Sequence, residues 1–403
     1  MKPLENIVVL DLGRVVAAPV ATQMLADFGA TVIKVERPVT GDEVRNYGPP
    51  FLKDPEGNDS RESGYFLAYN RNKKSVTIDI SKPEGQELIR QLARKADILV
   101  ENYKVGDLKR YGLDYAALAE VNPRLIYCSV TGYGQDGPYA DRPGLDSLFQ
   151  ARSGLMSVTG EADGEPVKVG VVIADMLTGY QAAFAIMAAL RHREVNGGRG
   201  QHIDLALLDV AFASLSHRVM EHLVGGNVPQ RMGNESVGTA PAGLYRCADG
   251  PLIITAGIET QFQKLVEVLG RPDLANDPRF SVRKQRIANK DELNAILNAE
   301  LGKRRRDETI AALEAAGVMV APINTVPEAL EDPQLRHRGM VIETNHPFQD
   351  SLKLLANPIR MSDTPVTNYD APPLLGQHTD EILEEFLGVS AEQVSGFRDR
   401  GVI

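Results

Sequence analysis

The chain has 403 residues, of which 43% are hydrophobic and 24% are charged, and its formal net charge is −10 at pH 7. This length is sufficient for two modest domains. The negative charge argues against nucleic acid or an acidic membrane as a partner, although it is compatible with a local basic pocket.

Neither the start of the chain nor its longest apolar-rich stretch predicts a membrane location. The start, MKPLENIVVLDLG, lacks the basic region and the cleavage site of a signal peptide. The longest apolar-rich stretch, residues 176–190, is shorter than the roughly 20 residues that a membrane span needs. We therefore expect a cytoplasmic protein with no membrane partner.

The first third of the chain alternates predicted strands with predicted helices. Short apolar runs typical of buried strands occur at 6–12, 31–36, 75–80, 96–102 and 124–134. Helices are predicted between them at 18–29, 81–96 and 113–121. The second of these helices opens on a capping-box pattern, Ser81 followed by Glu84, with Pro83 in its first turn. Strands separated by helices pair in parallel, so we expect an α/β fold with a doubly wound, Rossmann-like parallel sheet.

Beyond residue 136 the pattern becomes mainly helical. Helices are expected at 144–154, 176–193 and 204–224, with a short strand before the last of these. Two β-rich runs joined at Asp249-Gly250 predict a hairpin. Two helices and a strand near 317–324 follow, and the tail ends in a further helix.

These segments predict a large domain that is built from both chain ends, together with a smaller α/β domain. We expect the large domain to contain residues 1–200 and 326–403, with a linker helix at 201–227 and the small domain at 228–325.

Two kinds of bound group are not expected from the motifs. The first strand–helix loop, DLGRVVAAP, contains only Gly13, whereas a dinucleotide fingerprint needs three glycines, even though Glu36 occupies the place of a ribose-binding acid. The cysteines and histidines lack the spacing of a metal site, and Cys128, in the run LIYCSV, is expected to be a buried thiol. We therefore predict no metal and no permanently bound cofactor.

Several segments together resemble the class III CoA-transferases, the superfamily of formyl-CoA and carnitine CoA-transferases. They are IKVERPVTGDEVR (33–45), NRNKKSVTIDI (70–80), ADILVENYKVGDLKRYGLD (96–114), CSVTGYGQDGPYADRPGLD (128–146), VIADMLTGYQAAFAIMAAL (172–190), GGRGQHIDLALLD (197–209) and PLLGQHTDEIL (373–383). They cover most of the chain in the family's order. The resemblance implies an interlocked homodimer, in which each chain threads through a ring formed by the other.

The resemblance gives Asp175 the role of the covalent nucleophile that attacks an acyl-CoA thioester. By its local pattern alone, an aspartate before an apolar helix is a helix cap. The two roles are compatible, because a helix N-terminus favours an ionised carboxylate, the form that attacks carbonyl carbon.

The resemblance also implies which residues hold CoA. It places Arg37 beside the adenine and phosphates, Asn102 and Arg110 near the nucleotide and diphosphate, and Val15 and Ala17 along the pantetheine arm. Arg14 stands where formyl-CoA transferase has histidine. Lys73, with Lys74 next to it, can add positive charge.

The expected reaction moves CoA from an acyl-CoA donor, such as succinyl-CoA, to a free carboxylic acid, through aspartyl anhydride and aspartyl-CoA thioester intermediates. A small dicarboxylate is the favoured acceptor, since Arg45, Arg71 and Arg142 are available to bind a second carboxylate. The poly-glycine flap of formyl-CoA transferase is absent, and 233–243 is the nearest candidate for a loop that excludes water.

Two other functions remain open alternatives. An α-methylacyl-CoA racemase would need a proton-transferring histidine in the segment RPGLD, where this sequence has Leu145. A non-catalytic CoA-binding protein would not need Asp175. Exchange of CoA between an acyl-CoA and a free acid separates the transferase from both.

Overall fold

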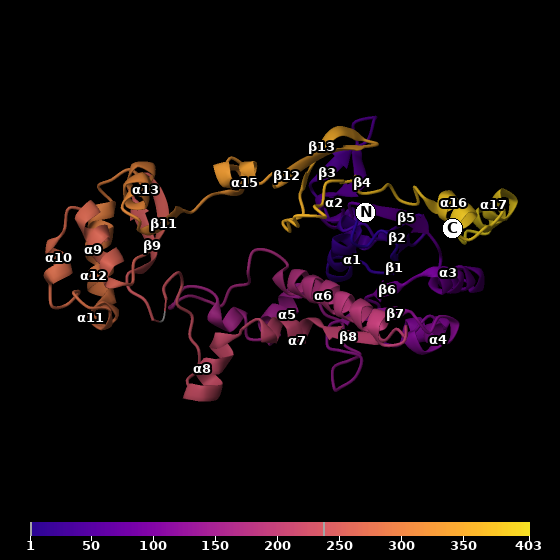
Figure 1. Cartoon of the computed structure of the whole chain (residues 1–403), viewed down its shortest axis with the longest axis horizontal. Helices are drawn as coiled ribbons and strands as arrows, with labels where there is room; N and C mark the ends of the chain where they lie inside the picture. Colours follow the sequence, from indigo (N-terminus) through magenta and orange to yellow (C-terminus); the bar gives the residue numbers. More distant parts are fainter. Residues whose placement is uncertain (1, 237) are drawn as a thin grey trace. The chain divides into compact units, whose positions relative to one another are not determined.

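The computed structural model describes residues 2–236 and 238–403. These residues form two compact units (Figure 1). Unit 1 contains the described residues up to Leu155, with Lys168–Met220 and Arg336–Ile403, and unit 2 contains Met156–Val167 and the described part of Glu221–Leu335. The expected flap, 233–243, includes Val237, which lies outside the described residues.

Unit 1 is built on a six-stranded sheet of order β5-β2-β1-β6-β7-β8, in which every neighbouring pair is parallel. Its strands are β1 (Val8–Asp11), β2 (Thr31–Glu36), β5 (Lys73–Thr77), β6 (Ile98–Glu101), β7 (Ile126–Thr131) and β8 (His202–Ala206). The strand order reverses direction between β1 and β6. In such sheets a crevice opens at that point, outside the carboxyl ends of the strands.

The sheet forms from apolar runs because both of its faces are buried. β6 and β7 are buried at every residue. Alternate residues face opposite sides, so Val9 joins one hydrophobic cluster and Leu10 joins the other. The doubly wound parallel sheet that the sequence predicts is confirmed.

Helices cover both faces of this sheet. They are α1 (Ala17–Asp27), α2 (Gly64–Tyr69), α3 (Pro83–Lys95), α4 (Tyr115–Val121), α5 (Asp146–Arg152), α6 (Ile173–Val195) and α7 (Leu207–Ala213), with short helices η1 (Glu43–Asn46) and η2 (Leu108–Tyr111). Helices α1 and α6 pack closely at Gly179, where a Cβ atom would lie 2.7 Å from the Ala17 carbonyl oxygen. The absence of a side chain at Gly179 therefore sets how near α6 comes to the start of α1.

The C-terminal segment of unit 1 returns to the N-terminal sheet. It contains α15 (Pro333–His337, which begins in unit 2), β12 (Val341–His346), β13 (Gln349–Leu355), α16 (Thr379–Glu381), η4 (Ile382–Phe386) and α17 (Ala391–Asp399). The Asp79 N–H donates to the Val402 carbonyl oxygen (2.7 Å). The His378 N–H donates to the Ser75 carbonyl oxygen (2.9 Å). Leu383 and Val402 are buried in the same cluster as Leu10.

Unit 2 has its own core around a three-stranded antiparallel sheet of order β11-β10-β9. The strands are β9 (Ala242–Cys247), β10 (Gly250–Thr255) and β11 (Met319–Pro322), and the helices are η3 (Met156–Val158), α9 (Glu259–Val268), α10 (Asp273–Asn276), α11 (Arg283–Ala288), α12 (Lys290–Leu301), α13 (Arg306–Ala315) and α14 (Val326–Leu330). The hairpin at Asp249-Gly250 is confirmed.

Several helices and strands differ from those that the sequence predicted. Ser81 does not cap α3, because its hydroxyl donates to Asp79 Oδ1 (2.6 Å) and Lys82 takes the N-cap position. The single helix expected at 204–224 is β8, α7 and α8 (His217–Gly225), interrupted where Ser216 adopts a φ of 48°. Five helices, rather than two, separate β10 from β11. The hairpins β3–β4 (Phe51–Lys53 and Asp59–Ser63) and β12–β13 were not predicted.

Helix α6 is longer than its apolar run in the sequence. Its 23 residues make it long and apolar enough to cross a membrane by length and composition, a criterion that the core helices of water-soluble proteins also meet. Ala182 and Ile186 of this helix are buried in the core of unit 1.

Candidate active site

A cavity of about 370 Å³ lies where the strand order of unit 1 reverses. Its wall is formed by the loops that follow the carboxyl ends of β1, β6 and β7, and by the first turn of α6. Among the predicted site residues, it brings together Asp175, Arg14, Val15, Ala17 and Asn102. Parallel α/β proteins place their ligands in this position.

Asp175 projects from the first turn of α6, two residues after the helix begins at Ile173. The N-cap residue is Val172, so Asp175 is not the cap that its local pattern suggests. Burial and the nearby charge of Asp146 raise the pKa of Asp175 to about 7, and the backbone N–H of Ala17 lowers it only in part. Burial and the charge of Asp146 therefore oppose the ionisation that a helix N-terminus favours.

Asp146, in the first turn of α5, supplies the missing cap of α6. Its Oδ1 atom accepts hydrogen bonds from the N–H groups of Ala174 (2.7 Å) and Asp175 (3.3 Å), and Gln150 donates to Oδ2. The carboxylate is buried. Sequence reasoning missed this role because the two partners are 28 and 29 residues away, and nothing local marks such a contact.

The loop after β1 is held in an uncommon conformation by two side chains from other elements. Asn102 accepts from the Arg14 N–H (2.8 Å) and donates to the Arg14 carbonyl oxygen (2.7 Å). Val15 has a φ of 65°, rare for a β-branched residue, and its N–H donates to Asp42 Oδ1 (3.1 Å). The Asn102 side chain thus holds the protein backbone.

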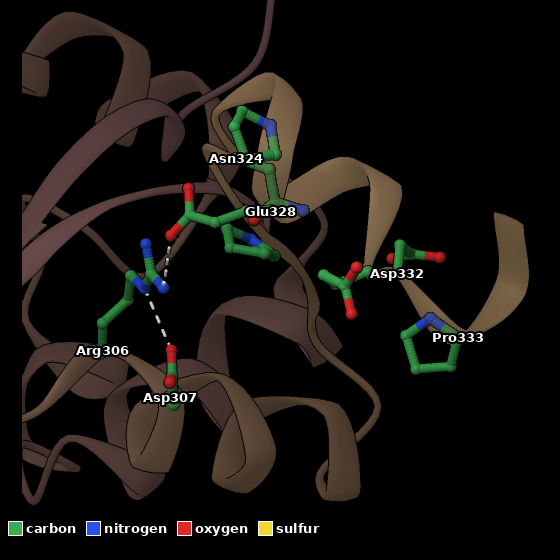
Figure 2. Close-up of a pocket in the computed structure, with 9 residues that line it drawn as sticks. Arg306, Asp307, Asn324, Glu328, Asp332 and Pro333 are labelled. Atoms are coloured by element: carbon green, nitrogen blue, oxygen red, sulfur yellow. Dashed lines mark hydrogen bonds and ion pairs between the residues drawn. The ribbon is translucent and has the colours of Figure 1, made fainter. Parts of the chain in front are cut away.

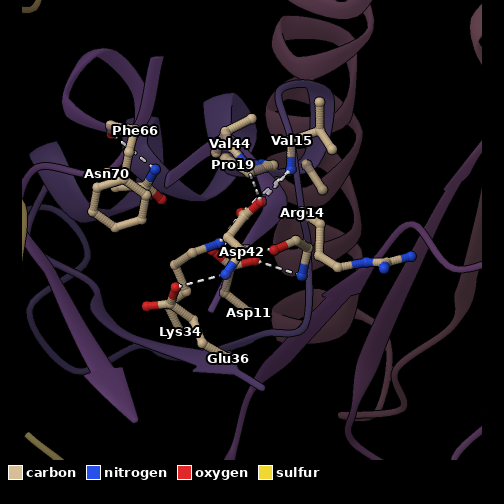
Figure 3. Close-up of polar contacts among 12 residues, drawn as sticks. Asp11, Arg14, Val15, Pro19, Lys34, Glu36, Asp42, Val44, Phe66 and Asn70 are labelled. Atoms are coloured by element: carbon tan, nitrogen blue, oxygen red, sulfur yellow. Dashed lines mark hydrogen bonds and ion pairs between the residues drawn. The ribbon is translucent and has the colours of Figure 1, made fainter. Parts of the chain in front are cut away.

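A buried ion pair fixes the same loop from beneath (Figure 3). Lys34 Nζ lies 2.8 Å from Asp42 Oδ2 and donates to the Gly13 carbonyl oxygen (2.9 Å). Both side chains are almost fully buried. Burial lowers the pKa of Lys34, but the carboxylates of Asp42, Asp11 and Glu36 outweigh burial and raise it. The charged lysine therefore ties β2 to the loop that carries the Ala17 N–H.

Lys73 is not available to CoA, which corrects one predicted contact. Its ammonium is fully buried, 3.1 Å from Asp11 Oδ2, and donates to the Asn70 side chain and the Pro19 carbonyl oxygen. The positive charge of Lys73 is used inside the core, where it neutralises Asp11.

The other predicted CoA-binding residues, all arginines, differ in what surrounds their side chains. Arg37 lines a second cavity, of about 140 Å³, whose wall shares Arg14, Glu43 and Tyr103 with the cavity of Asp175. Arg110 is exposed and pairs with Asp107 at 2.7 Å. Arg14 pairs with Glu43 at 3.1 Å and stacks over Tyr103. The CoA-binding roles of Arg14, Arg37 and Arg110 stay predictions.

Two of the three arginines expected to bind a second carboxylate are unavailable. Arg45 is fully buried between Glu36 and Glu62. Arg71 pairs with buried Asp27. Only Arg142 lines the cavity of Asp175.

Another pocket lies in unit 2, where Arg306 contacts Asp307 and Glu328 (Figure 2). The Asp307 side chain is 83% exposed. Ion pairs that are solvated in this way add little to the stability of the fold, and they do not make a carboxylate more reactive. Within residues 2–236 and 238–403, no three His, Cys, Asp or Glu side chains are grouped so as to hold a metal ion.

Comparisons with known proteins identify the family. The model of CoA-transferase family III matches residues 4–379. The chain belongs to CoA-transferase family III. This confirms the family that the sequence motifs resemble.

Relatives of this CoA-transferase match over nearly their whole length. The succinate–glutarate CoA-transferase of Agrobacterium fabrum is 44% identical over 384 residues, which are 95% of each chain. The succinyl-CoA:glutarate CoA-transferase of Homo sapiens is 38% identical and is matched over 90% of its length by all of this chain. A solved CaiB/BaiF family protein from Brucella suis superposes with a TM-score of 0.88 at 43% identity, covering 95% of this chain and 99% of that one.

Proposed function

We propose that this protein transfers CoA from succinyl-CoA to a small dicarboxylic acid such as glutarate, with Asp175 as the covalent nucleophile. The observation that carries the proposal is the position of Asp175. Its carboxyl group shares a cavity with the backbone of the β1 loop, at the point where parallel sheets bind ligands. The relatives named succinate–glutarate and succinyl-CoA:glutarate CoA-transferases support the choice of substrates.

The reaction begins when an oxygen of ionised Asp175 attacks the thioester carbonyl carbon of the donor. A carbon–oxygen bond forms, the carbon–sulfur bond breaks, and a mixed anhydride and CoA thiolate result. The thiolate then attacks the Asp175 carbonyl carbon, which releases the donor acid and leaves an aspartyl-CoA thioester.

The second half repeats these steps with the acceptor. Its carboxylate attacks the aspartyl thioester, giving a new anhydride and thiolate, and the thiolate attacks the acceptor carbonyl carbon. Asp175 returns as a carboxylate. Each step conserves an activated acyl bond, and no net proton is taken up or released.

The Ala17 N–H can support these steps because it lies near Asp175 and favours the ionised form of its carboxyl group. A fixed backbone donor at this place can stabilise negative charge that develops on oxygen in the tetrahedral intermediates. Hydrogen bonds from Asn102, Asp42 and Lys34 hold the loop after β1, which leads to Ala17, in place before substrate binds.

The two adjoining cavities suggest how CoA lies. The thioester and pantetheine arm would occupy the cavity of Asp175, Val15 and Ala17, and the nucleotide would reach Arg37 through the wall that the two cavities share. The exposed charge of Arg110 would then meet phosphate near the protein surface.

Mass spectrometry of the intact protein tests this proposal. Incubation with succinyl-CoA should add the mass of CoA less water, and peptide mapping should place the adduct on Asp175. Asp175→Ala and Asp175→Asn should abolish both the adduct and CoA exchange. Exchange that persists in these variants would contradict the assignment.

The racemase alternative lacks a proton-transferring side chain at the place where its histidine is expected. The side chain at the expected place of a histidine is Leu145, which lines the cavity and is 66% exposed. An aliphatic side chain cannot transfer a proton. Exchange of the α-proton of a bound acyl-CoA with solvent, in the absence of any free acid, would favour the racemase.

We further propose that the protein is a cytoplasmic, interlocked homodimer that acts without a metal. The apolar side chains left exposed on α6, among them Phe184 at 73% and Met187 at 43%, are suited to an interface between two copies. Light scattering should give the mass of two chains.

A further inference from the structure

The loop after β7 and the end of α5 carry a cluster of cations and aromatic rings that the proposed reaction does not use. The Arg142 guanidinium lies 4.0 Å from the centre of the Tyr139 ring, and that of Arg152 lies 4.2 Å from it. The Arg142 N–H also donates to the Tyr139 carbonyl oxygen (2.9 Å). Tyr139 therefore holds both the backbone and the side chain of Arg142.

Arg142 differs from the other cations that line the cavity of Asp175. Arg14 is neutralised by Glu43 at 3.1 Å. Lys104 is exposed on the loop after β6 and has no aromatic or carboxylate contact that would fix it, within the part of the chain that is described. Across residues 2–236 and 238–403, Arg142 also forms no ion pair, but its guanidinium is oriented by Tyr139.

We propose that Arg142 determines the specificity of this site for dicarboxylic acids by binding the carboxylate at the far end of the acyl group. This inference rests on the proposed CoA-transferase function. Arg142 and Asp175 line the same cavity, so an acid with one carboxyl group at Asp175 can direct its second carboxylate to Arg142.

The stacking on Tyr139 suits this role. An aromatic ring contacts the flat face of a guanidinium group and leaves the N–H donors at its edge free. Those donors match the two oxygens of a carboxylate and can bind both at once. Because Tyr139 orients the group in advance, less side-chain entropy is lost when the acid binds.

The inference predicts a selective effect on the acceptor. In Arg142→Gln, kcat/KM for glutarate should fall about 10- to 100-fold, the usual range for loss of a hydrogen-bonded charge pair. The kcat/KM for a monocarboxylic acid of equal length, pentanoate, should change less than about 3-fold. The ratio of the two constants is therefore the measured quantity.

Two matched variants separate this role from simpler effects. Lys104→Gln removes the same charge from the same cavity, and Arg152→Gln removes the other cation on Tyr139. Both should keep the glutarate-to-pentanoate ratio within about 3-fold of that of the unmodified protein. A similar loss of the ratio in Lys104→Gln would overturn the proposal, because general electrostatic attraction would then explain it.

The remaining outcomes are also decisive. If Arg142→Gln slows both acceptors equally, or raises the KM of succinyl-CoA without changing the ratio, Arg142 binds another part of the substrates and the inference is wrong. If the unmodified protein transfers CoA to neither acid and forms no Asp175 adduct, the proposed function itself fails. The two failures are thus distinguishable.

Discussion

At the scale of single residues, the site depends on two carboxyl groups with different tasks. Asp146 accepts hydrogen bonds from N–H groups in the first turn of α6. These N–H groups are therefore not available to stabilise the negative charge of the Asp175 carboxylate. Together with burial, the charge of Asp146 raises the pKa of Asp175 to about 7. Only the ionised carboxylate attacks a thioester, so the rate of adduct formation should rise as the pH increases through 7 and then level off.

We expect Asp146→Asn to move this pH profile to lower pH. The amide still accepts from the Ala174 N–H but carries no charge, so the pKa of Asp175 falls and the midpoint of the adduct-formation profile should decrease by about one pH unit. Stopped-flow or quenched mass spectrometry between pH 5 and 9 measures it. Asp209→Asn, an exposed acid on α7, is the control that should leave the midpoint in place. An unchanged midpoint in Asp146→Asn would mean that burial alone sets the pKa.

We expect Asn102→Ala to slow adduct formation about 10- to 100-fold, because the loop that carries the Ala17 N–H loses both of its hydrogen bonds to Asn102. The matched control is Asn122→Ala. The Asn122 side chain also bonds to the backbone, donating to the carbonyl oxygens of Ala93 and Ala96 and accepting from the Arg124 N–H, and it does not line the cavity. Single-turnover rates should fall only in Asn102→Ala, whereas thermal unfolding should change in both. Equal rates in the two variants would contradict a positioning role for Asn102.

At the scale of elements, the site depends on how closely α6 approaches α1. Gly179 permits this approach, since a Cβ atom there would lie 2.7 Å from the Ala17 carbonyl oxygen and 2.7 Å from Val20 Cβ. The Ala17 N–H also lies near Asp175 and favours its ionised form. The packing of two helices therefore controls the position of a donor in the cavity.

We expect Gly179→Val to destabilise the protein by about 1–3 kcal/mol through overpacking and to slow adduct formation. Ala116→Val introduces the same β-branched side chain at an exposed position of α4, so it should cost only the small helix-propensity difference. Chemical denaturation and single-turnover kinetics check both effects. A Gly179→Val protein with unaltered stability and rate would show that α1 and α6 separate freely.

At the scale of the whole molecule, unit 1 is completed by both ends of the chain. Leu383 is fully buried among residues of the N-terminal sheet, and Lys74 forms an ion pair with Glu381. Residues more than 300 positions apart in sequence thus share one hydrophobic core.

We expect Leu383→Ala to lower the free energy of unfolding by about 2–5 kcal/mol, the usual cost of a cavity left by a buried leucine. Leu355→Ala, at a side chain that is 64% exposed, should change it by less than about 0.5 kcal/mol. Urea denaturation followed by circular dichroism compares them. Equal stabilities would argue against a structural role for the C-terminal segment in unit 1.

Apolar runs such as 31–36 and 124–134 were sufficient to predict the parallel sheet, because a strand buried on both faces has a distinctive local composition. The family segments were sufficient to select Asp175 as the candidate nucleophile. The protonation of Asp175 was not predictable, because it depends on burial and on Asp146, a partner 29 residues away. The availability of arginines was not predictable either, since Arg45 and Arg142 differ only in their surroundings.

The sequence by itself therefore determined the alternating α/β pattern, the family and the candidate nucleophile, since these are properties of local composition and ordered motifs. Only the tertiary structure decided which charges remain free for substrate and which are used within the core, as Lys73 and Arg45 are. The physical reason is that burial and ionic pairing depend on residues brought together from distant parts of the chain.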